Sequence, residues 1–189
     1  MTAPLIVGIG GTTRAGSGTE KALVQSLMAA EAVGAETQLF GGAFLAKLPV
    51  YAPNGDAPTD EQQALADAVS RADGVIVASP GYHGSISGLI KNALDSLELL
   101  RNDPQPYFQG RPVGCIITAD GWQAAGTTLM ALRSIIHAMR GWPTPFGAAL
   151  NATSDLFDAE GRCREAKDAW QLETVAEQVM EFAKMRAGA

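Results

Sequence analysis

The sequence predicts an α/β protein in which a parallel sheet is covered by helices on both faces. Strand-like and helix-like segments alternate along the whole chain, which is typical of strand–helix–strand units with right-handed crossovers. Residues 74–78 read Gly-Val-Ile-Val-Ala without polar alternation, as expected of a strand buried on both sides. Two glycine-rich loops, residues 11–19 and 79–88, each follow a short apolar run and precede a helical pattern. This is where an open α/β sheet binds ligands.

Five strands are expected from short apolar runs. The fifth is the weakest, because Pro143 and Pro145 flank its start and cannot donate backbone hydrogen bonds. The expected strands cover residues 5–9, 36–40, 74–78, 112–118 and 144–150. This succession suits a flavodoxin-like three-layer sandwich with the strand order 2-1-3-4-5, whose ligand crevice lies between the first and third strands. These are the strands that carry the two loops.

The helices follow from apolar periodicity and from their termini. Thr59 and Gln62 have the spacing of a capping box. Residues 41–58 are rich in proline and are expected to form an irregular surface loop. A further loop is expected at residues 120–126, before a helix with apolar residues from 129 to 139 on one face. The other expected helices cover residues 18–33, 59–72, 87–100 and 165–186.

Length and composition indicate one globular domain over residues 1–189. The chain is 47% hydrophobic and 18% charged, as in ordinary globular proteins. Its net charge of -6, without any basic run, argues against a nucleic-acid partner. No apolar stretch approaches the roughly 20 residues that span a bilayer, so no membrane partner is expected.

The start of the chain and its cysteines predict a cytoplasmic location. The first residues lack the basic and apolar regions of a secretory signal. Cys115 and Cys163 are too few and too far apart for a disulfide framework or a zinc site, and His137 has no metal-spaced partner. No metal is expected. Cys163 lies between Arg162 and Arg164, which would favour an exposed thiolate, although no resolving cysteine suggests a redox role.

The first glycine-rich loop has the composition of a phosphate cradle. Its glycines have P-loop spacing, but Ser17 stands where the P-loop lysine should be. A dinucleotide fingerprint that starts at Gly8 would need its third glycine at the position of Thr13. Hydrolysis of a nucleoside triphosphate and a Rossmann-type site are therefore both disfavoured.

The remaining groups suit a terminal phosphate monoester. Hydroxyls of Thr12, Ser17 and Thr19, the guanidinium of Arg14 and the amides of a helix N-terminus can all donate to such an anion. Each charged hydrogen bond would contribute roughly 1.5–3 kcal/mol. The alternative is an ordinary turn whose hydroxyls only cap the helix.

The second loop suits a flat aromatic ring. Pro80 stiffens its entry, while Gly81 and Gly84 allow the backbone to approach a ligand closely. Such a surface can aim amide hydrogens at the polar edge of a flavin, and Tyr82 could add an aromatic wall. Together the loops predict a phosphorylated aromatic cofactor.

Three polar side chains of this loop have open roles. His83 is either a proton-transfer residue or a residue that shapes the loop, and hydride chemistry on a flavin needs no side-chain acid or base. Ser85 and Ser87 are either helix caps or flavin contacts.

The two loops resemble those of the NAD(P)H-dependent FMN reductase family of flavodoxin-like proteins. The matching motifs are Gly-Thr-Thr-Arg-Ala-Gly-Ser at residues 11–17 and Ser-Pro-Gly-Tyr-His-Gly-Ser-Ile-Ser-Gly-Leu-Ile-Lys-Asn-Ala-Leu-Asp at residues 79–95. The resemblance implies noncovalent FMN, hydride from NADPH or NADH, and electron transfer to a flavin, quinone, azo compound or metal oxyanion. It also implies a phosphate held by Thr12, Arg14, Ser17 and Thr19, and a flavin bordered by Pro80, Gly81, Tyr82, His83, Gly84 and Ser85.

A third loop is expected to complete the cofactor site with Asp120, Gly121 and Trp122. It departs from the glycine-rich stretch that relatives often have there. One hypothesis is that Trp122 narrows the space beside the flavin and changes which acceptor can stack on it. The other is that Trp122 packs in a subunit interface.

Two functions agree with these observations. The first is an FMN-dependent NAD(P)H oxidoreductase, expected as a homodimer or homotetramer in which residues 41–58 complete a neighbour's nicotinamide pocket. The second is a flavodoxin-type electron carrier without reductase activity. A carrier would be expected to show acidic clustering around the flavin, whereas the charge of -6 is spread thinly here.

Overall fold

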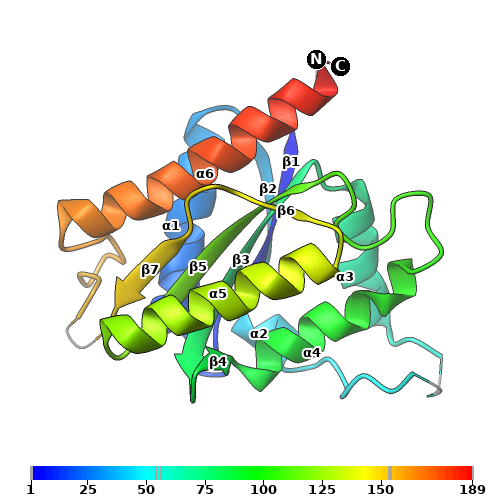
Figure 1. Ribbon diagram of the computed structural model, residues 1–189, viewed down its shortest axis with the longest axis horizontal. Coiled ribbons are helices and arrows are strands. Elements are labelled where there is room, and N and C mark those ends of the chain that lie inside the picture. Colours follow the sequence, from blue (N-terminus) through cyan, green and yellow to red (C-terminus); the bar gives the residue numbers. More distant parts are fainter. Residues whose placement is uncertain (1, 54, 56, 153–154, 189) are drawn as a thin grey trace.

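A parallel sheet forms the middle layer of the protein, with helices packed on both faces (Figure 1). The computed structural model describes residues 2–53, 55, 57–152 and 155–188. The sheet runs in the order β2-β1-β3-β5-β6, and β7 pairs with β5 beyond the end of β6. Its parallel strands are β1 (Leu5–Gly10), β2 (Glu36–Phe40), β3 (Gly74–Tyr82), β5 (Pro112–Ala119), β6 (Trp142–Pro143) and β7 (Ala148–Asn151). The predicted three-layer fold class and the order of its strands are confirmed.

The sheet has seven strands rather than the five predicted. Of the strand expected at residues 144–150, only the last part forms, as β7, and the short strand β6 precedes the expected range. Pro143 and Pro145 lack the backbone donors that would join the two into one strand. The additional strand is β4 (Ser85–Ile86), which pairs antiparallel with the end of β3. Part of the loop expected at residues 79–88 is thus a hairpin.

The helices divide between the two faces of the sheet (Figure 1). One face is covered by α1 (Gly18–Ala32) and α6 (Ala166–Ala187). The opposite face is covered by α3 (Asp60–Arg71), α4 (Gly88–Ser96) and α5 (Trp122–Ala138). The 3₁₀ turn η1 (Leu97–Leu100) continues α4. Among the described residues, no helix is long and apolar enough to cross a membrane.

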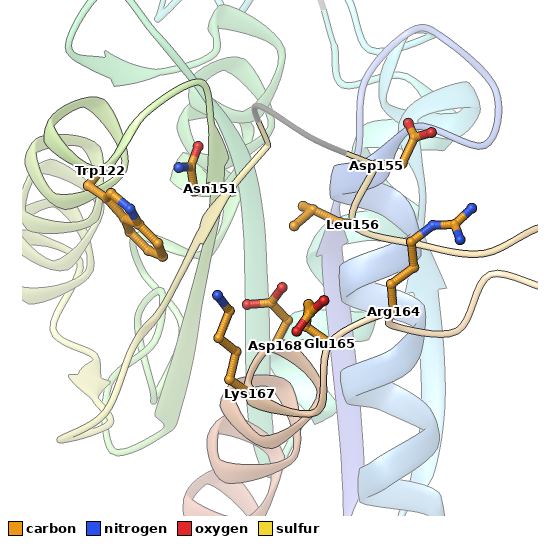
Figure 2. Close-up of a pocket in the computed structure, with 8 residues that line it drawn as sticks. All are labelled: Trp122, Asn151, Asp155, Leu156, Arg164, Glu165, Lys167 and Asp168. Atoms are coloured by element: carbon orange, nitrogen blue, oxygen red, sulfur yellow. The ribbon is translucent and has the colours of Figure 1, made fainter.

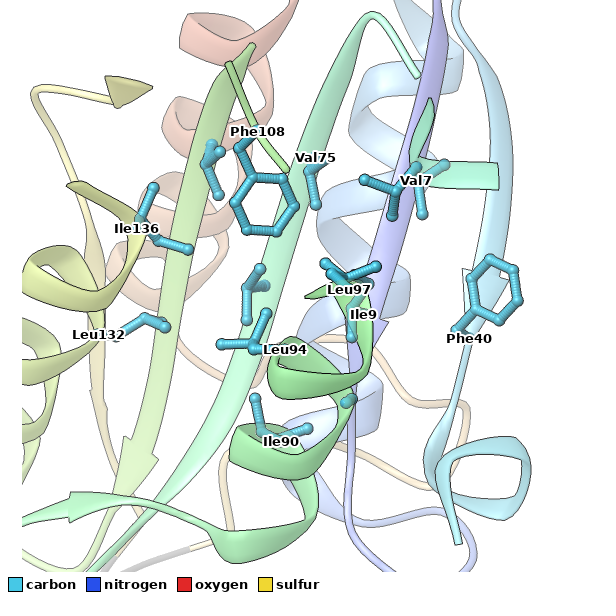
Figure 3. Packing of buried hydrophobic residues seen from close by; sticks show 14 of the residues in the cluster. Val7, Ile9, Phe40, Val75, Ile90, Leu94, Leu97, Phe108, Leu132 and Ile136 are labelled. Carbon is cyan, nitrogen blue, oxygen red and sulfur yellow. The ribbon is translucent and has the colours of Figure 1, made fainter. Parts of the chain in front are cut away.

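Alternate residues of the strands belong to two separate hydrophobic clusters, one on each face of the sheet. In the central strands, Ile6 and Ile76 pack under α1 and α6, whereas Val7 and Val75 pack under the helices of the opposite face. This follows from the period of two along a strand. Figure 3 shows the second cluster, in which α4 contributes Ile90 and its neighbours. Both clusters fix the central strands, and hence the ends from which the loops emerge.

Two predicted loops contain helix. The segment 41–58 begins with the short helix α2 (Gly42–Leu45), whose first amide donates to Glu20 Oε2 at 2.8 Å. This long-range contact is not visible in local sequence. The loop expected at residues 120–126 is already α5 from Trp122 onward. The capping box at Thr59 and Gln62 is confirmed.

Candidate functional site

A cavity of about 710 Å³ opens where the carboxyl ends of β1, β3 and β5 meet. Because these strands are parallel neighbours, the turns that follow them share one edge of the sheet. The cavity volume lies within the usual range of small-molecule sites. Its lining residues are Thr12, Thr13, Arg14, Ser17, Gly18, Thr19, Pro80, Gly81, Tyr82, His83, Thr118, Ala119, Asp120, Ala124 and Ala152.

The turn between β1 and α1 presents donors to one end of this cavity. Gly16 has a φ of +65°, which lets the chain turn into the helix. Ser17 is the N-cap of α1, and its hydroxyl oxygen accepts a hydrogen bond from Glu20 N at 3.3 Å. Its hydroxyl proton is therefore available to an anion at the helix N-terminus.

Thr12 and Arg14 have different roles in this turn. Thr12 Oγ1 accepts from Arg14 N at 3.2 Å and donates to Arg14 O at 3.4 Å, so this hydroxyl shapes the loop itself. The Arg14 guanidinium lines the cavity, and no hydrogen bond or ion pair to it is found within the described part of the chain. It is the cation of this end of the cavity.

A buried pair of hydroxyls links the first turn to β5. Thr19 Oγ1 and Thr118 Oγ1 lie 2.6 Å apart, and both residues line the cavity. One proton occupies the bond between them, so the other hydroxyl can donate elsewhere. Sequence reasoning missed Thr118. Its position as a polar residue near the end of a buried central strand was the available signal.

Glu20 joins the start of α1 to α2. Its carboxylate accepts the amide of Gly42 at 2.8 Å. A Cβ on Gly42 would lie only 1.8 Å from Thr12 O, so the loop and α2 pack closely. This acid is thereby occupied by a backbone donor.

The second loop is a tight hairpin at the other end of the cavity. Tyr82 pairs with Ser85, and the two residues between them, His83 and Gly84, have φ angles of 51° and 83°. Positive φ at both central positions is the type I′ turn that suits two-residue hairpins. Residues 80–83 line the cavity, whereas Gly84 and Ser85 of the same hairpin do not.

Two serines secure the base of the hairpin. The buried Ser79 hydroxyl donates to Pro80 O at 2.9 Å and accepts from Ser87 N at 3.0 Å. Ser87 caps α4 by accepting from Ile90 N at 3.3 Å, so the helix-cap interpretation holds for Ser87. Ser85 belongs to β4 instead.

The third loop contributes less to this cavity than the sequence predicted. Asp120 lines it, but Gly121 and Trp122 do not. Gly121 has a φ of 96°, and its N–H donates to Asn151 Oδ1 at 2.9 Å, which ties the loop to β7. Trp122 lines a neighbouring cavity toward α6 (Figure 2).

The expectation of an exposed Cys163 thiolate is wrong. Cys163 is half-buried and makes a β-bridge with Phe157. Burial, together with the carboxylates of Asp168, Glu173 and Asp158, raises the pKa of its thiol to about 11. The neighbouring arginines bind other groups: Arg162 pairs with Asp158 and Arg164 donates to Phe157 O.

The donor set of the large cavity fits FMN. A guanidinium, two hydroxyls with available protons and the N-terminus of the 15-residue helix α1 lie at one end, as a phosphate monoester requires. At the other end, a hairpin with small residues offers backbone amides beside Tyr82. The donors at the first end suit the phosphate of FMN, and the hairpin at the second end suits its flat ring.

Comparisons with known proteins agree with this chemistry. The family model described as NADPH-dependent FMN reductase matches residues 4–154. FMN-dependent NADPH-azoreductases of Staphylococcus aureus strains are 34% identical over 109 residues, which is 58% of this chain and 54% of theirs. The match thus spans about half the length of these curated relatives.

Solved structures share the fold. FerB, a flavoenzyme NAD(P)H:(acceptor) oxidoreductase from Paracoccus denitrificans, superposes with a TM-score of 0.80 at 22% identity, covering 97% of this chain and 98% of that one. The apo form of an NADH:FMN oxidoreductase has a TM-score of 0.72 at 24% identity, covering 97% of this chain and 90% of that one. At such identities, the likeness is one of fold.

Proposed function

The chain belongs to the NADPH-dependent FMN reductase family, and we propose that it binds FMN and passes electrons from NADPH or NADH to a small acceptor. The observation that carries this proposal is the shape of one cavity. The anion-binding turn with Arg14 lies at one end, and the hairpin at Pro80–His83 lies at the other. A phosphate tail and a flat ring fit these ends respectively.

The phosphate would be held by three side chains and one helix. Arg14 would supply the positive charge, while Ser17 and Thr19 would donate hydroxyl protons. The N-terminus of α1 would add its free amides. Thr12 would keep the turn in shape through its bonds to Arg14.

The ring would lie against the β3–β4 hairpin and the β5–α5 turn. FMN supplies the hydride and electron chemistry when bound. The backbone amides of residues 81–83 would face the ring edge, and Tyr82, which is exposed, would cover part of the ring. His83 would hold the turn through its left-handed backbone conformation.

Anaerobic reduction tests the proposal directly. Purified protein loaded with FMN is mixed with NADPH or NADH under nitrogen while the flavin absorbance is followed. We expect rapid bleaching by at least one donor, followed by recovery when a flavin, quinone, azo dye or metal oxyanion is added. A protein that stays yellow with both donors would be a carrier and not a reductase.

The acceptor is proposed by analogy with a relative. The Staphylococcus aureus proteins are named azoreductases, so we propose azo compounds as one acceptor class beside quinones and free flavin. Ranking the initial rates of reoxidation across this panel tests it. If azo dyes reoxidise the flavin no faster than dissolved oxygen does, they are not an acceptor class of this protein.

We also propose a homodimer or homotetramer that acts in the cytoplasm. Val50 is 86% exposed and lies with Leu99 along an open groove of about 510 Å³, a surface suited to a second copy. Val50→Asp should lower the mass measured by light scattering if this groove is an interface. Cys115 and Cys163 are free thiols, which agrees with a reducing compartment.

A further inference from the structure

A second cavity of about 420 Å³ lies between the start of α5, the end of β7 and the start of α6. Figure 2 shows Trp122 and Lys167 extending into the same space from these two helices, with the Asp168 carboxylate beside them. Trp122 is 58% exposed. Trp142 and Trp170 each pack against a phenylalanine, whereas no ring contact of Trp122 is found among the described residues. Its indole is therefore free to stack on a ligand.

Asp168 gives this cavity a buried acceptor. The residue is only 4% exposed, although it carries a carboxylate and lines the cavity. Its Oδ1 accepts from Gln171 Nε2 at 3.3 Å. No hydrogen bond to its Oδ2 is found in the described part of the chain. A carboxylate has two acceptor oxygens, so Asp168 can still accept a hydrogen bond from a ligand hydroxyl in the cavity that it lines.

Lys167 gives the cavity a mobile cation. Its side chain is exposed, lines the cavity and makes no ion pair with any described residue. A flexible ammonium of this kind suits a phosphate group. The cavity thus combines an aromatic face for a base, a carboxylate that can accept a hydrogen bond from a ribose hydroxyl, and an ammonium that can bind a phosphate. These are the three groups that a nucleotide needs.

A third cavity lies next to both this cavity and the candidate FMN site. This smaller cavity of about 210 Å³ shares Asp155 and Leu156 with the Trp122 cavity. It shares Arg14, Gly18 and Ala152 with the large cavity. The three cavities are therefore neighbours along one edge of the protein.

We propose that the Trp122 cavity binds the adenosine half of the nicotinamide dinucleotide donor, an inference that rests on the proposed function. The adenine stacks on Trp122, a ribose hydroxyl donates to Asp168, and a phosphate meets Lys167. The nicotinamide half then extends from the Trp122 cavity toward the flavin site. Trp122 is in this account a residue that recognises the donor.

Binding of donor fragments tests the site without any turnover. ADP-ribose and its 2′-phosphorylated form carry the adenosine half but no nicotinamide. Each is titrated by calorimetry into the purified protein, with and without added FMN. We expect at least one to bind, and Trp122→Ala to weaken it about tenfold, the scale of one base stacked on an aromatic ring. The fragment that binds more tightly tells whether the site prefers the 2′-hydroxyl of NADH or the 2′-phosphate of NADPH.

Matched variants separate the site from general damage. Lys167→Gln should weaken the same fragment at low salt, and this surface change tests the cavity even where Trp122→Ala folds poorly. Trp142→Ala removes an equally exposed tryptophan outside the cavity and should leave fragment affinity as in the wild type. Equal affinity of wild type, Trp122→Ala and Lys167→Gln would overturn the proposal.

Steady-state kinetics provides the second readout. The dinucleotide is compared with 1-benzyl-1,4-dihydronicotinamide, which lacks adenosine. Trp122→Ala should raise KM for the dinucleotide relative to KM for the truncated donor by about tenfold. An equal change for both donors, or a lower oligomeric mass with unchanged fragment binding, would assign Trp122 to another role.

The outcomes distinguish this proposal from the proposed function. Flavin bleaching with unaltered fragment binding in Trp122→Ala would sustain the reductase and overturn the adenosine site. Fragment binding at Trp122 without bleaching by any donor would sustain the site and overturn the reductase. If no fragment binds and no donor bleaches the flavin, both the adenosine site and the reductase function are overturned.

Discussion

Thr19 at the start of α1 and Thr118 near the end of β5 are 99 residues apart in the chain, yet their hydroxyl oxygens lie 2.6 Å apart. Both side chains are buried at the wall of the large cavity. If Thr118 donates to Thr19, the proton of Thr19 is left for the phosphate. The pair thus sets the direction of a donor at the proposed phosphate site.

Thr118→Val should weaken FMN binding more than riboflavin binding. The valine keeps the shape but removes the partner that orients the Thr19 hydroxyl, and a hydrogen bond of this kind is worth about 1 kcal/mol. The measurement is fluorescence titration of both flavins. Thr118→Ser keeps the hydroxyl and serves as the control. Equal losses for FMN and riboflavin would mean that Thr118 acts on the fold and not through the phosphate.

Gly81→Ala should destabilise the protein by about 1–3 kcal/mol through overpacking. The new Cβ would lie 2.8 Å from Ala119 Cβ and 2.9 Å from Thr128 Oγ1, beneath the cavity. Gly88→Ala is the matched control, since among the described residues no atom beyond its chain neighbours and its own helix backbone lies within 4 Å of the new Cβ. Urea unfolding of both variants gives the comparison. A fully stable Gly81→Ala would show that this wall can move.

Thr128→Val should raise the free energy of unfolding by about 1 kcal/mol. Thr128 Oγ1 is buried, and it has no hydrogen-bond partner among the described residues. A methyl group of similar size removes that unpaired oxygen. Thr144→Val is the opposite case, because the Thr144 hydroxyl donates to Phe146 O at 2.8 Å. Urea unfolding should therefore show changes of opposite sign, and destabilisation by both would refute this reasoning.

Alkylation of Cys163 should accelerate steadily as the pH rises above 8. Its folded-state pKa of about 11 lies above the ordinary thiol value of about 8.5, so the native state favours the protonated form. That contribution to stability is complete below about pH 8.5 and is lost as the pH rises toward about 11. Mass spectrometry of iodoacetamide-treated native protein gives the site-specific rate. A rate that levels off near pH 7 would instead indicate a thiolate held by arginines.

The local sequence predicted the features that depend on apolar periodicity and on helix-capping residues. The apolar run at Gly74–Ala78 identified a central strand, and Thr59 with Gln62 identified the start of α3. The two glycine-rich loops lie at neighbouring strand ends because a parallel sheet brings such ends together. The strand order therefore followed from a few short segments.

The features that sequence did not predict depend on distant contacts. α2 starts where Glu20 binds the amide of Gly42, and Thr118 enters the site through Thr19. Arg111 is 2% exposed and donates to the carbonyls of Ala72, Ser70 and Tyr107, an arrangement that no local pattern indicates. Burial lowers the pKa of this guanidinium. Trp122 could not be assigned to its cavity before α6 was placed beside it.

Titration of the purified protein with FMN, riboflavin and an adenine nucleotide tests the central claim most directly. FMN should bind one per chain and more tightly than riboflavin, because Arg14 and the N-terminus of α1 recognise its phosphate. Arg14→Gln should bring the two flavins closer in affinity by removing a charged bond worth roughly 1.5–3 kcal/mol. No binding of FMN, with the adenine nucleotide taking the cavity instead, would contradict the account.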